Sequence, residues 1–205
     1  MTVKITESAI EEYALEILTN QGFEYIHGSE IAPDSDSPER NSFEEVILSG
    51  RLKKTVHRIN KNLPHETIDA ALKQINRLNS TELIVNNETF HRLLTEEINI
   101  SVQKDSYTRG DYVKLIDFDE PDNNEFLAVS QFTVTSTGSV TGAVNKRPDI
   151  ILFVNGIPLV VIELKNPSED NATVHSAFRQ IQTYKETIPA FFTYKAFCAA
   201  FFNVC

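Results

Sequence analysis

The stretch PDIILFVNGIPLVVIELK, residues 148–165, decides the fold class. Its two apolar runs, 150–154 and 159–162, flank Asn155-Gly156, a dipeptide typical of the tight turn of a β-hairpin. Both runs are apolar at successive positions, which predicts strands buried on both faces inside a sheet covered by helices. We therefore expect an α/β fold in which helices flank a central β-sheet.

Charged residues stand at the open end of this hairpin. Asp149 begins the first strand, and Glu163 and Lys165 end the second. Buried charges are costly without partners, and two neighbouring carboxylates attract a divalent cation. Glu163 and Lys165 are two residues apart and share a face of the strand, whereas Leu164 points the other way. A structural interpretation is also open, in which Asp149 belongs to a turn and Glu163 to Lys165 form a strand end that emerges into solvent.

The register of the hairpin determines whether Asp149 and Glu163 share a face. A plain two-residue loop would put the two carboxylates on opposite faces, because a shift of one residue reverses every side chain. Pro158 has no N–H to give to a ladder, so an irregular turn is expected. A site made from both carboxylates requires an odd loop, a bulge or a kink at Pro148.

A second signal follows in residues 171–187. Apolar residues recur there at helical spacing (Val174, Phe178, Ile181 and Tyr184), and Pro189 follows, which predicts an amphipathic helix. Gln180 and Tyr184 are four apart and share a face of that helix. In a purely structural interpretation the Tyr belongs to the core and the Gln is solvated.

Pro148-Asp149 followed by Glu163-Leu164-Lys165 resembles the signature of restriction-endonuclease-like, metal-dependent nucleases, which have a central mixed β-sheet flanked by helices. With Gln180 and Tyr184 on the next helix, the chain is similar to the N-terminal nuclease domain of the motor (R) subunit of type I restriction enzymes. Further resemblance lies in Asn124-Glu125-Phe126, in Gln131-Phe132-Thr133-Val134 and in the opening from Thr6-Glu7 to Gly22-Phe23. The likeness covers most of residues 5–197 and is loose between residues 33 and 99.

The resemblance implies hydrolysis of phosphodiester bonds in DNA. Asp149 and Glu163 would hold Mg²⁺, with the Leu164 backbone as a further ligand, and Lys165 would orient or deprotonate the attacking water. Gln180 and Tyr184 would orient the catalytic groups or the DNA backbone.

The resemblance also implies an acidic residue of the first helix that approaches the metal, matched by Glu7 or Glu11. Projected along a helix, Glu7 falls within the apolar stripe and Glu11 lies at its edge. Glu7 also has a structural interpretation, as a first-turn residue favoured by the helix dipole.

The implied partners are double-stranded DNA and the modification and specificity subunits of the restriction complex. ATP would be needed only by translocase domains of the full-length subunit, since the sequence has no Gly-x-x-x-x-Gly-Lys-Ser/Thr motif. We expect residues 1–205 to form a single nuclease domain, an N-terminal fragment of that larger subunit.

Composition limits the remaining possibilities. A chain of 205 residues with 41% hydrophobic content can form one α/β domain with a full core. The two Cys make no disulfide framework, and neither a signal peptide nor a run of 18 apolar residues occurs. These features favour a cytoplasmic protein that does not enter a membrane.

The net charge of −10 argues against a simple nucleic-acid binder and favours a nuclease domain to which another domain brings the DNA. Two basic segments could still contact phosphates: Lys53 and Arg58 within residues 51–61, and Lys146-Arg147 just before the hairpin. The alternative for each segment is a solvated face.

Two other function classes remain open. One is a standalone restriction or repair nuclease of the same fold, and the other is a non-catalytic interaction module that has kept the fold. The intact Asp149, Glu163 and Lys165 disfavour the module, and the helix with Gln180 and Tyr184 favours the type I domain over the standalone enzyme.

Besides the hairpin, the patterns predict helices over residues 6–21, 42–60, 65–78, 88–97 and 171–187 and strands over 114–118, 126–135 and 191–198. A turn is expected over residues 120–124 and a loop over 136–145.

Overall fold

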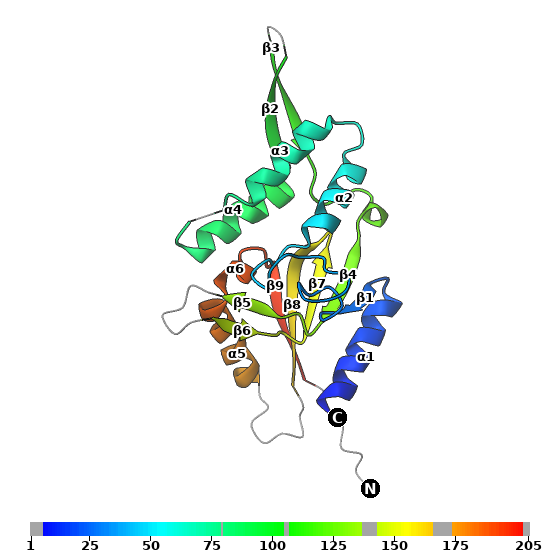
Figure 1. The fold of residues 1–205 in the computed structure, drawn as a ribbon, viewed down its shortest axis with the longest axis vertical. Coiled ribbons are helices and arrows are strands. Elements are labelled where there is room, and N and C mark those ends of the chain that lie inside the picture. Colours follow the sequence, from blue (N-terminus) through cyan, green and yellow to red (C-terminus); the bar gives the residue numbers. More distant parts are fainter. Residues whose placement is uncertain (1–5, 79, 105–106, 137–142, 166–173, 203–205) are drawn as a thin grey trace.

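The computed structural model describes residues 6–78, 80–104, 107–136, 143–165 and 174–202 (Figure 1). At its centre is a five-stranded sheet in the order β1-β4-β7-β8-β9. The outer pairs β1–β4 and β8–β9 are parallel, and the inner pairs β4–β7 and β7–β8 are antiparallel. The predicted α/β fold with a central mixed sheet is confirmed. The strands are β1 (Glu24–His27), β4 (Phe126–Ser130), β7 (Ile150–Val154), β8 (Ile157–Lys165) and β9 (Phe197–Phe202).

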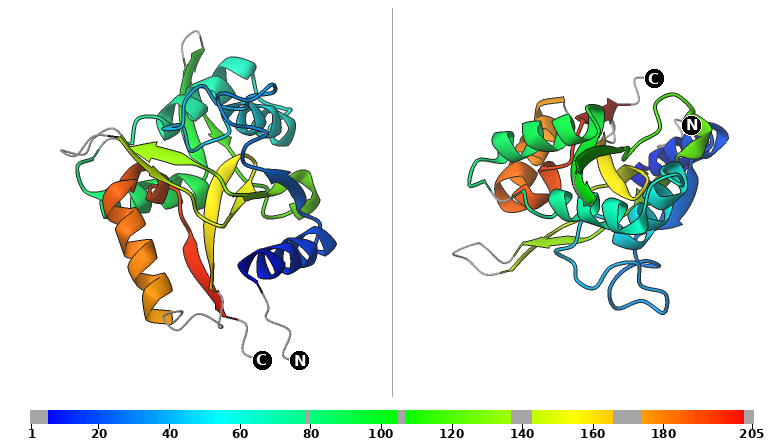
Figure 2. Two further views of the ribbon diagram at one scale, coloured as in Figure 1. Left: turned by 60° about the horizontal axis from the view of Figure 1, so that its bottom comes forward. Right: turned by 90° about the horizontal axis from the view of Figure 1, so that it is seen from above.

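Helices cover both faces of this sheet. In Figures 1 and 2 the sheet lies between α1 (Glu7–Asn20) and α5 (Val174–Thr187). Alternate residues of each strand divide between two cores: Ile151 and Val161 pack with Ile181 of α5, whereas Ile150 and Ile162 pack with Ile10 of α1. The unbroken apolar runs of the hairpin are explained by this burial on two sides.

A third layer covers the turn end of the hairpin. It comprises α2 (Ser49–Ile59), α3 (His65–Ile75), α4 (Leu83–Thr95) and the ribbon formed by β2 (Ile98–Lys104) and β3 (Tyr107–Val113). These elements share a core that includes Val56, Phe90 and Ile157. The smaller elements of the fold are η1 (Pro121–Asn123), β5 (Val134–Ser136), β6 (Val144–Lys146) and α6 (Pro189–Phe192).

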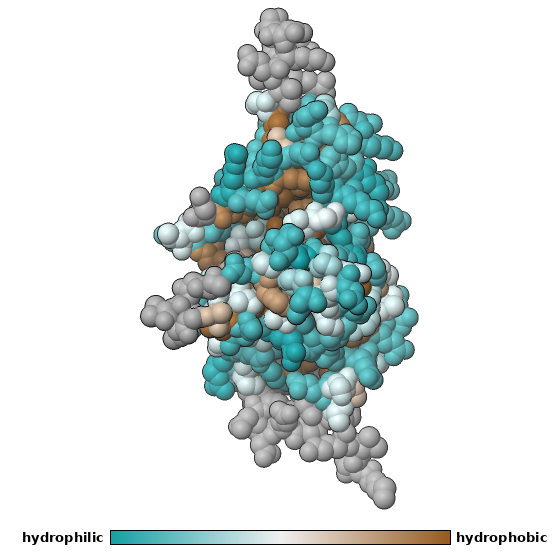
Figure 3. Space-filling model, viewed as in Figure 1, coloured by the Kyte–Doolittle hydropathy of each residue, from teal (hydrophilic) through white to brown (hydrophobic). Residues whose placement is uncertain are grey.

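The surface shown in Figure 3 is mainly hydrophilic, with apolar side chains visible over the α3–α4 region. Ile84 and Val85 of α4 are among the exposed large apolar side chains. None of the described helices has the length and apolar character needed to cross a membrane.

The hairpin has the irregularity that a shared carboxylate site requires. Asn155 and Gly156 form a two-residue turn, both at positive φ. Phe153 pairs with Pro158, but Leu152 pairs with Val160, so Leu159 is an extra residue in β8. Because of this bulge the strand pairing shifts by one residue, so that Ile150 lies opposite Ile162. Asp149 therefore comes opposite Glu163.

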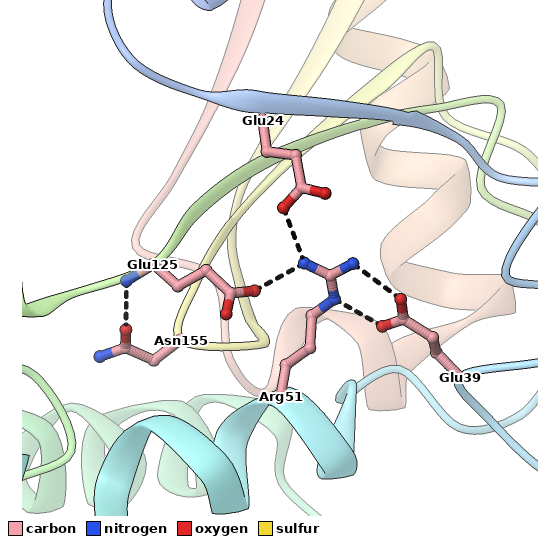
Figure 4. A network of polar contacts seen from close by, with 5 residues as sticks. All are labelled: Glu24, Glu39, Arg51, Glu125 and Asn155. Carbon is pink, nitrogen blue, oxygen red and sulfur yellow. Dashed lines mark hydrogen bonds and ion pairs between the residues drawn. The ribbon is translucent and has the colours of Figure 1, made fainter. Parts of the chain in front are cut away.

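An arginine joins several segments at the turn end (Figure 4). Arg51 of α2 forms ion pairs with Glu39 at 2.6 Å, with Glu125 at 2.7 Å and with Glu24 of β1 at 3.0 Å. The side chain of Asn155 accepts the backbone N–H of Glu125 at 2.8 Å. The hydrogen bond to Glu39 is the largest reason why the pKa of Arg51 is raised above its ordinary value. This network ties α2 to β1, to the residue that precedes β4 and, through Asn155, to the hairpin turn.

Several predicted boundaries were wrong for identifiable reasons. The helix expected over 42–60 begins only at Ser49, because residues 46–48 are buried and Leu48 donates its N–H to Gly156. The strand expected over 114–118 is absent: the side chain of Asn60 binds both backbone groups of Lys114, replacing a strand partner. The helix expected over 88–97 begins five residues earlier, at Leu83.

Two predicted strands also end differently. The strand expected over 126–135 stops at Ser130, because Gln131 has a φ of 55°. The strand expected over 191–198 is a short helix at first, α6, and β9 begins at Phe197. The helices over 6–21 and 65–78 and the turn over 120–124 are confirmed to within three residues. The predicted start of the helix over 171–187 and residues 137–142 of the loop over 136–145 lie outside the described residues. The loop prediction was wrong at both described ends, because Ser136 ends β5 and Val144 begins β6.

The tight contact at the hairpin turn gives a stability prediction. A Cβ at Gly156 would lie 2.5 Å from Leu48 O and 2.9 Å from Leu52 N, whereas a Cβ at Gly22 would meet nothing within 4 Å. Both glycines have positive φ, so Gly22→Ala measures conformational strain alone, about 1 kcal/mol. Gly156→Ala should lower the free energy of unfolding by about 3 kcal/mol. Urea denaturation compares the two, and equal losses would contradict the close contact.

Candidate active site

The open end of the β7–β8 hairpin brings Asp149, Glu163 and Lys165 together on the face that α5 covers. Glu163 and Lys165 follow Val161 at steps of two along β8, and Val161 packs against α5. The bulge at Leu159 places Asp149 on that same face. Glu163 is fully buried, and Asp149 and Lys165 are half-buried.

Asp149 is held from both sides. Its carboxylate Oδ2 accepts the backbone N–H of Leu164 at 2.7 Å, and its carbonyl accepts the N–H of Gln131 at 2.9 Å. The N–H and C=O of one strand residue point to the same side, so the Leu164 carbonyl also points toward the Asp149 strand. The Asp149 carboxylate thus replaces the backbone partner that Leu164 lacks where the ladder ends.

Gln180 of α5 connects the charged groups. Its Oε1 accepts from Lys165 Nζ at 2.6 Å, and its Nε2 donates to Glu163 Oε2 at 2.7 Å and to the Tyr184 hydroxyl at 2.7 Å. Only one orientation of the amide satisfies both an ammonium and a carboxylate. Lys165 Nζ lies 4.0 Å from Glu163 Oε2, so the amide stands between the two charges.

Glu163 is unusual in its surroundings. Its Oε1 is buried and has no hydrogen-bond partner among the residues that the structure describes. Burial and, next, the charge of Asp149 raise the pKa of Glu163 to about 8, although Lys165 and a hydrogen bond from Tyr184 lower it. Burial also raises the pKa of Tyr184. An ionised Glu163 in this position needs a cation beside it.

A divalent cation fits this donor set. Mg²⁺ binds oxygen ligands and commonly takes one or two carboxylates from a protein, with water and substrate phosphate completing its shell. Asp149, the unpartnered Oε1 of Glu163 and the Leu164 carbonyl are such oxygens. Within the described ranges, no group of three or more His, Cys, Asp or Glu side chains could hold a metal ion by itself.

Residues 4–202 match the sequence profile of the type I restriction enzyme R protein N terminus. The chain belongs to this family. It is 34% identical to the type I restriction enzyme HindI endonuclease subunit of Haemophilus influenzae. The match extends over 191 residues, which are 93% of this chain but 18% of that subunit. It is 31% identical over 188 residues to the putative MjaIXP endonuclease subunit of Methanocaldococcus jannaschii, covering 90% of the chain and 17% of that subunit. The chain thus spans less than a fifth of these relatives.

The two acidic alternatives on α1 lie in different surroundings in this member of the R protein family. Glu7 is exposed in the first turn of α1. Glu11 is half-buried, accepts a hydrogen bond from Gln131 Nε2 at 3.1 Å, and lies close enough to Asp149 that the two charges interact. Burial is the largest reason that the pKa of Glu11 is raised, and the charge of Asp149 adds to it. The structure thus brings Glu11, rather than Glu7, toward the candidate site.

The four basic residues named as DNA contacts divide between two places. Lys146 ends β6 and Arg147 is exposed, both just before Asp149. Lys53 and Arg58 lie on α2 at the turn end, about 17 Å of strand away from the carboxylates. Lys53 pairs with Asp69 at 3.1 Å, and Arg58 donates to the Asn123 carbonyl at 2.8 Å.

Gln131 was not among the site residues predicted from the sequence. In the sequence it belongs only to a stretch that resembles the family, and its contacts with Asp149 and Glu11 depend on the pairing of β4 with β7. No local pattern reveals that pairing, because the two strands are separated by β5, β6 and their connections.

The buried Glu163 predicts a pH dependence of stability without metal. The native carboxyl keeps its proton up to about pH 8, whereas the unfolded one releases it near its ordinary value of 4.5. The native state therefore binds more protons between these values, and the free energy of unfolding falls as the pH rises from about 4.5 to 8.

Thermal unfolding in EDTA measures this dependence. Glu163→Gln should flatten it and raise the melting temperature at pH 8, while the exposed Glu186→Gln serves as the control on α5. Parallel pH profiles of the wild type and Glu163→Gln would contradict this account of Glu163.

Proposed function

We propose that this chain is the Mg²⁺-dependent DNA endonuclease domain of a type I restriction R subunit. It cleaves phosphodiester bonds after translocation by ATP-driven domains outside these 205 residues. The observation that supports this most strongly is the convergence of Asp149, Glu163 and Lys165 on one face, with Gln180 bridging two of them. The relatives are named as endonuclease subunits of type I restriction enzymes.

Asp149 and Glu163 would hold the ion, with the Leu164 carbonyl as a third protein oxygen. When bound, Mg²⁺ supplies Lewis-acid stabilisation of the charge that develops on the phosphate and lowers the pKa of a bound water. The Leu164 N–H fixes the direction of the Asp149 carboxylate by its 2.7 Å hydrogen bond. The full burial of Glu163 shields its carboxylate from bulk water.

Lys165 orients the attacking water and contacts the scissile phosphate. Its ammonium has three donors, and the hydrogen bond to Gln180 takes one of them. Gln180 aligns Lys165 and Glu163 through a single amide, and Tyr184 fixes Gln180 from the next turn of α5. In this proposal these two residues position the catalytic groups.

DNA reaches this site as part of an assembly. A net charge of −10 is unfavourable for binding a polyanion, so other parts of the complex supply most of the phosphate contacts. In this proposal the modification and specificity subunits and the ATP-driven domains bring the duplex, while Lys146 and Arg147 contact its backbone beside Asp149.

Metal binding is the first test. Asp149→Asn keeps the shape of the side chain and an acceptor for the Leu164 N–H but removes the charge. The wild-type chain should bind Mn²⁺ or Mg²⁺ weakly in calorimetry, because water completes the coordination, and Asp149→Asn and Asp149→Ala should lose this binding. Asp122→Asn, at an exposed position in η1, is the matched control. Equal affinities of the wild type and both Asp149 variants would remove Asp149 from the metal site.

Cleavage and motor activity should be separable in the complete restriction complex. Lys165→Ala should slow DNA cleavage at least 100-fold, the size of effect typical of a lost acid–base or orienting group, and leave ATP hydrolysis nearly unchanged. Lys185→Ala, at an exposed position on the same helix as Gln180, is the control. If both activities fall together, Lys165 is structural, and if neither falls, the chain is a non-catalytic module.

A further inference from the structure

Gln131 has a backbone conformation that residues with a side chain rarely adopt. Its φ is 55°, in the left-handed region, at the point where β4 ends. Such strained residues cluster at functional sites and persist where the surrounding structure fixes them. The chain fixes this one tightly: a Cβ on the neighbouring Gly28 would lie 2.7 Å from Gln131 O and 2.9 Å from Phe132 Cα.

The backbone of Gln131 continues the β4–β7 ladder by one hydrogen bond. The last regular pair is Ser130 with Ile150, and Gln131 then donates its N–H to Asp149 O at 2.9 Å. The strand entry at Asp149 is thereby fixed on the β4 side, opposite the side on which Leu164 binds its carboxylate.

The side chain of Gln131 forms a hydrogen bond to helix α1. Its Nε2 donates to Glu11 Oε2 at 3.1 Å, across 120 residues of sequence. Glu11 belongs to α1, which packs on the other face of the sheet. Gln131 is therefore the residue through which a carboxylate of α1 is held beside Asp149.

We propose that Gln131 is a positioning residue of the nuclease site, whose amide holds Glu11 beside Asp149 while its backbone N–H fixes the strand entry. This proposal rests on the proposed metal-dependent function. The ionised Glu11 adds negative potential to the Asp149 end of the sheet and so favours a cation there. Gln131 itself contacts neither the ion nor the phosphate.

Mn²⁺ affinity of the 205-residue chain, measured by calorimetry, tests the proposal. Gln131→Asn carries the same amide on a side chain one carbon shorter, and Asn adopts positive φ more readily than most residues. Its melting temperature should equal that of the wild type, and its Mn²⁺ affinity should fall about tenfold, the lower end of the loss seen when outer contacts of metal ligands are removed. Gln21→Asn, at the exposed end of α1, should change neither.

A double-mutant cycle tests whether Gln131 affects Mn²⁺ binding through Glu11. Glu11→Ala and Gln131→Ala should each weaken Mn²⁺ binding, and the double variant should bind no more weakly than Glu11→Ala alone. Additive losses would overturn the proposal, because Gln131 would then act independently of Glu11. Unchanged Mn²⁺ affinity of Gln131→Asn, at whatever melting temperature, would also overturn it, provided that Asp149→Asn has lost binding. If Asp149→Asn binds as the wild type does, the proposed function fails instead.

Discussion

One unpaired residue in β8, Leu159, sets the chemistry of the open end of the sheet. Side chains alternate along a strand, so a regular hairpin with the Asn155-Gly156 turn would have directed Asp149 to the face opposite Glu163. The extra residue reverses that parity without lengthening the turn. The hairpin keeps its tight turn under α2, and the carboxylates share a face five residues away.

The amide of Gln180 lies between the side chains of Lys165 and Glu163. Lys165 Nζ lies 4.0 Å from Glu163 Oε2, which is too far for a direct hydrogen bond. The amide of Gln180 fills this space, accepting a hydrogen bond from Lys165 and donating one to Glu163. Among the described residues, the second oxygen of Glu163 has no hydrogen-bond partner.

The sequence was sufficient for the parts of the fold that depend on local pattern. The hairpin, the helices α1, α3 and α5 and the mixed sheet follow from periodicity, turn residues and resemblance, and the need for a bulge or kink followed from side-chain parity. It was insufficient where distant groups override local preference. The side chain of Asn60 binds the backbone of Lys114 in place of a strand partner. The Gly156 carbonyl accepts the N–H of Leu48, and residues 46–48 are not helical. The positive φ of Gln131 ends β4 early. The place of Gln131 in the candidate site could not be predicted either, because its contacts depend on a strand pairing that no local pattern reveals.

The order of the site's segments along the chain has a consequence for synthesis. The site draws on α1, on the end of β4, on the β7–β8 hairpin and on α5, and the contact between Gln131 and Glu11 spans 120 residues. Chains emerge from the ribosome from the N-terminus onward, and contacts of such long range form late because loop closure opposes them. Until Gln180 and Tyr184 have left the ribosome, Lys165 and Glu163 lack the groups that align them. A nascent chain that lacks α5 therefore cannot have the complete candidate site.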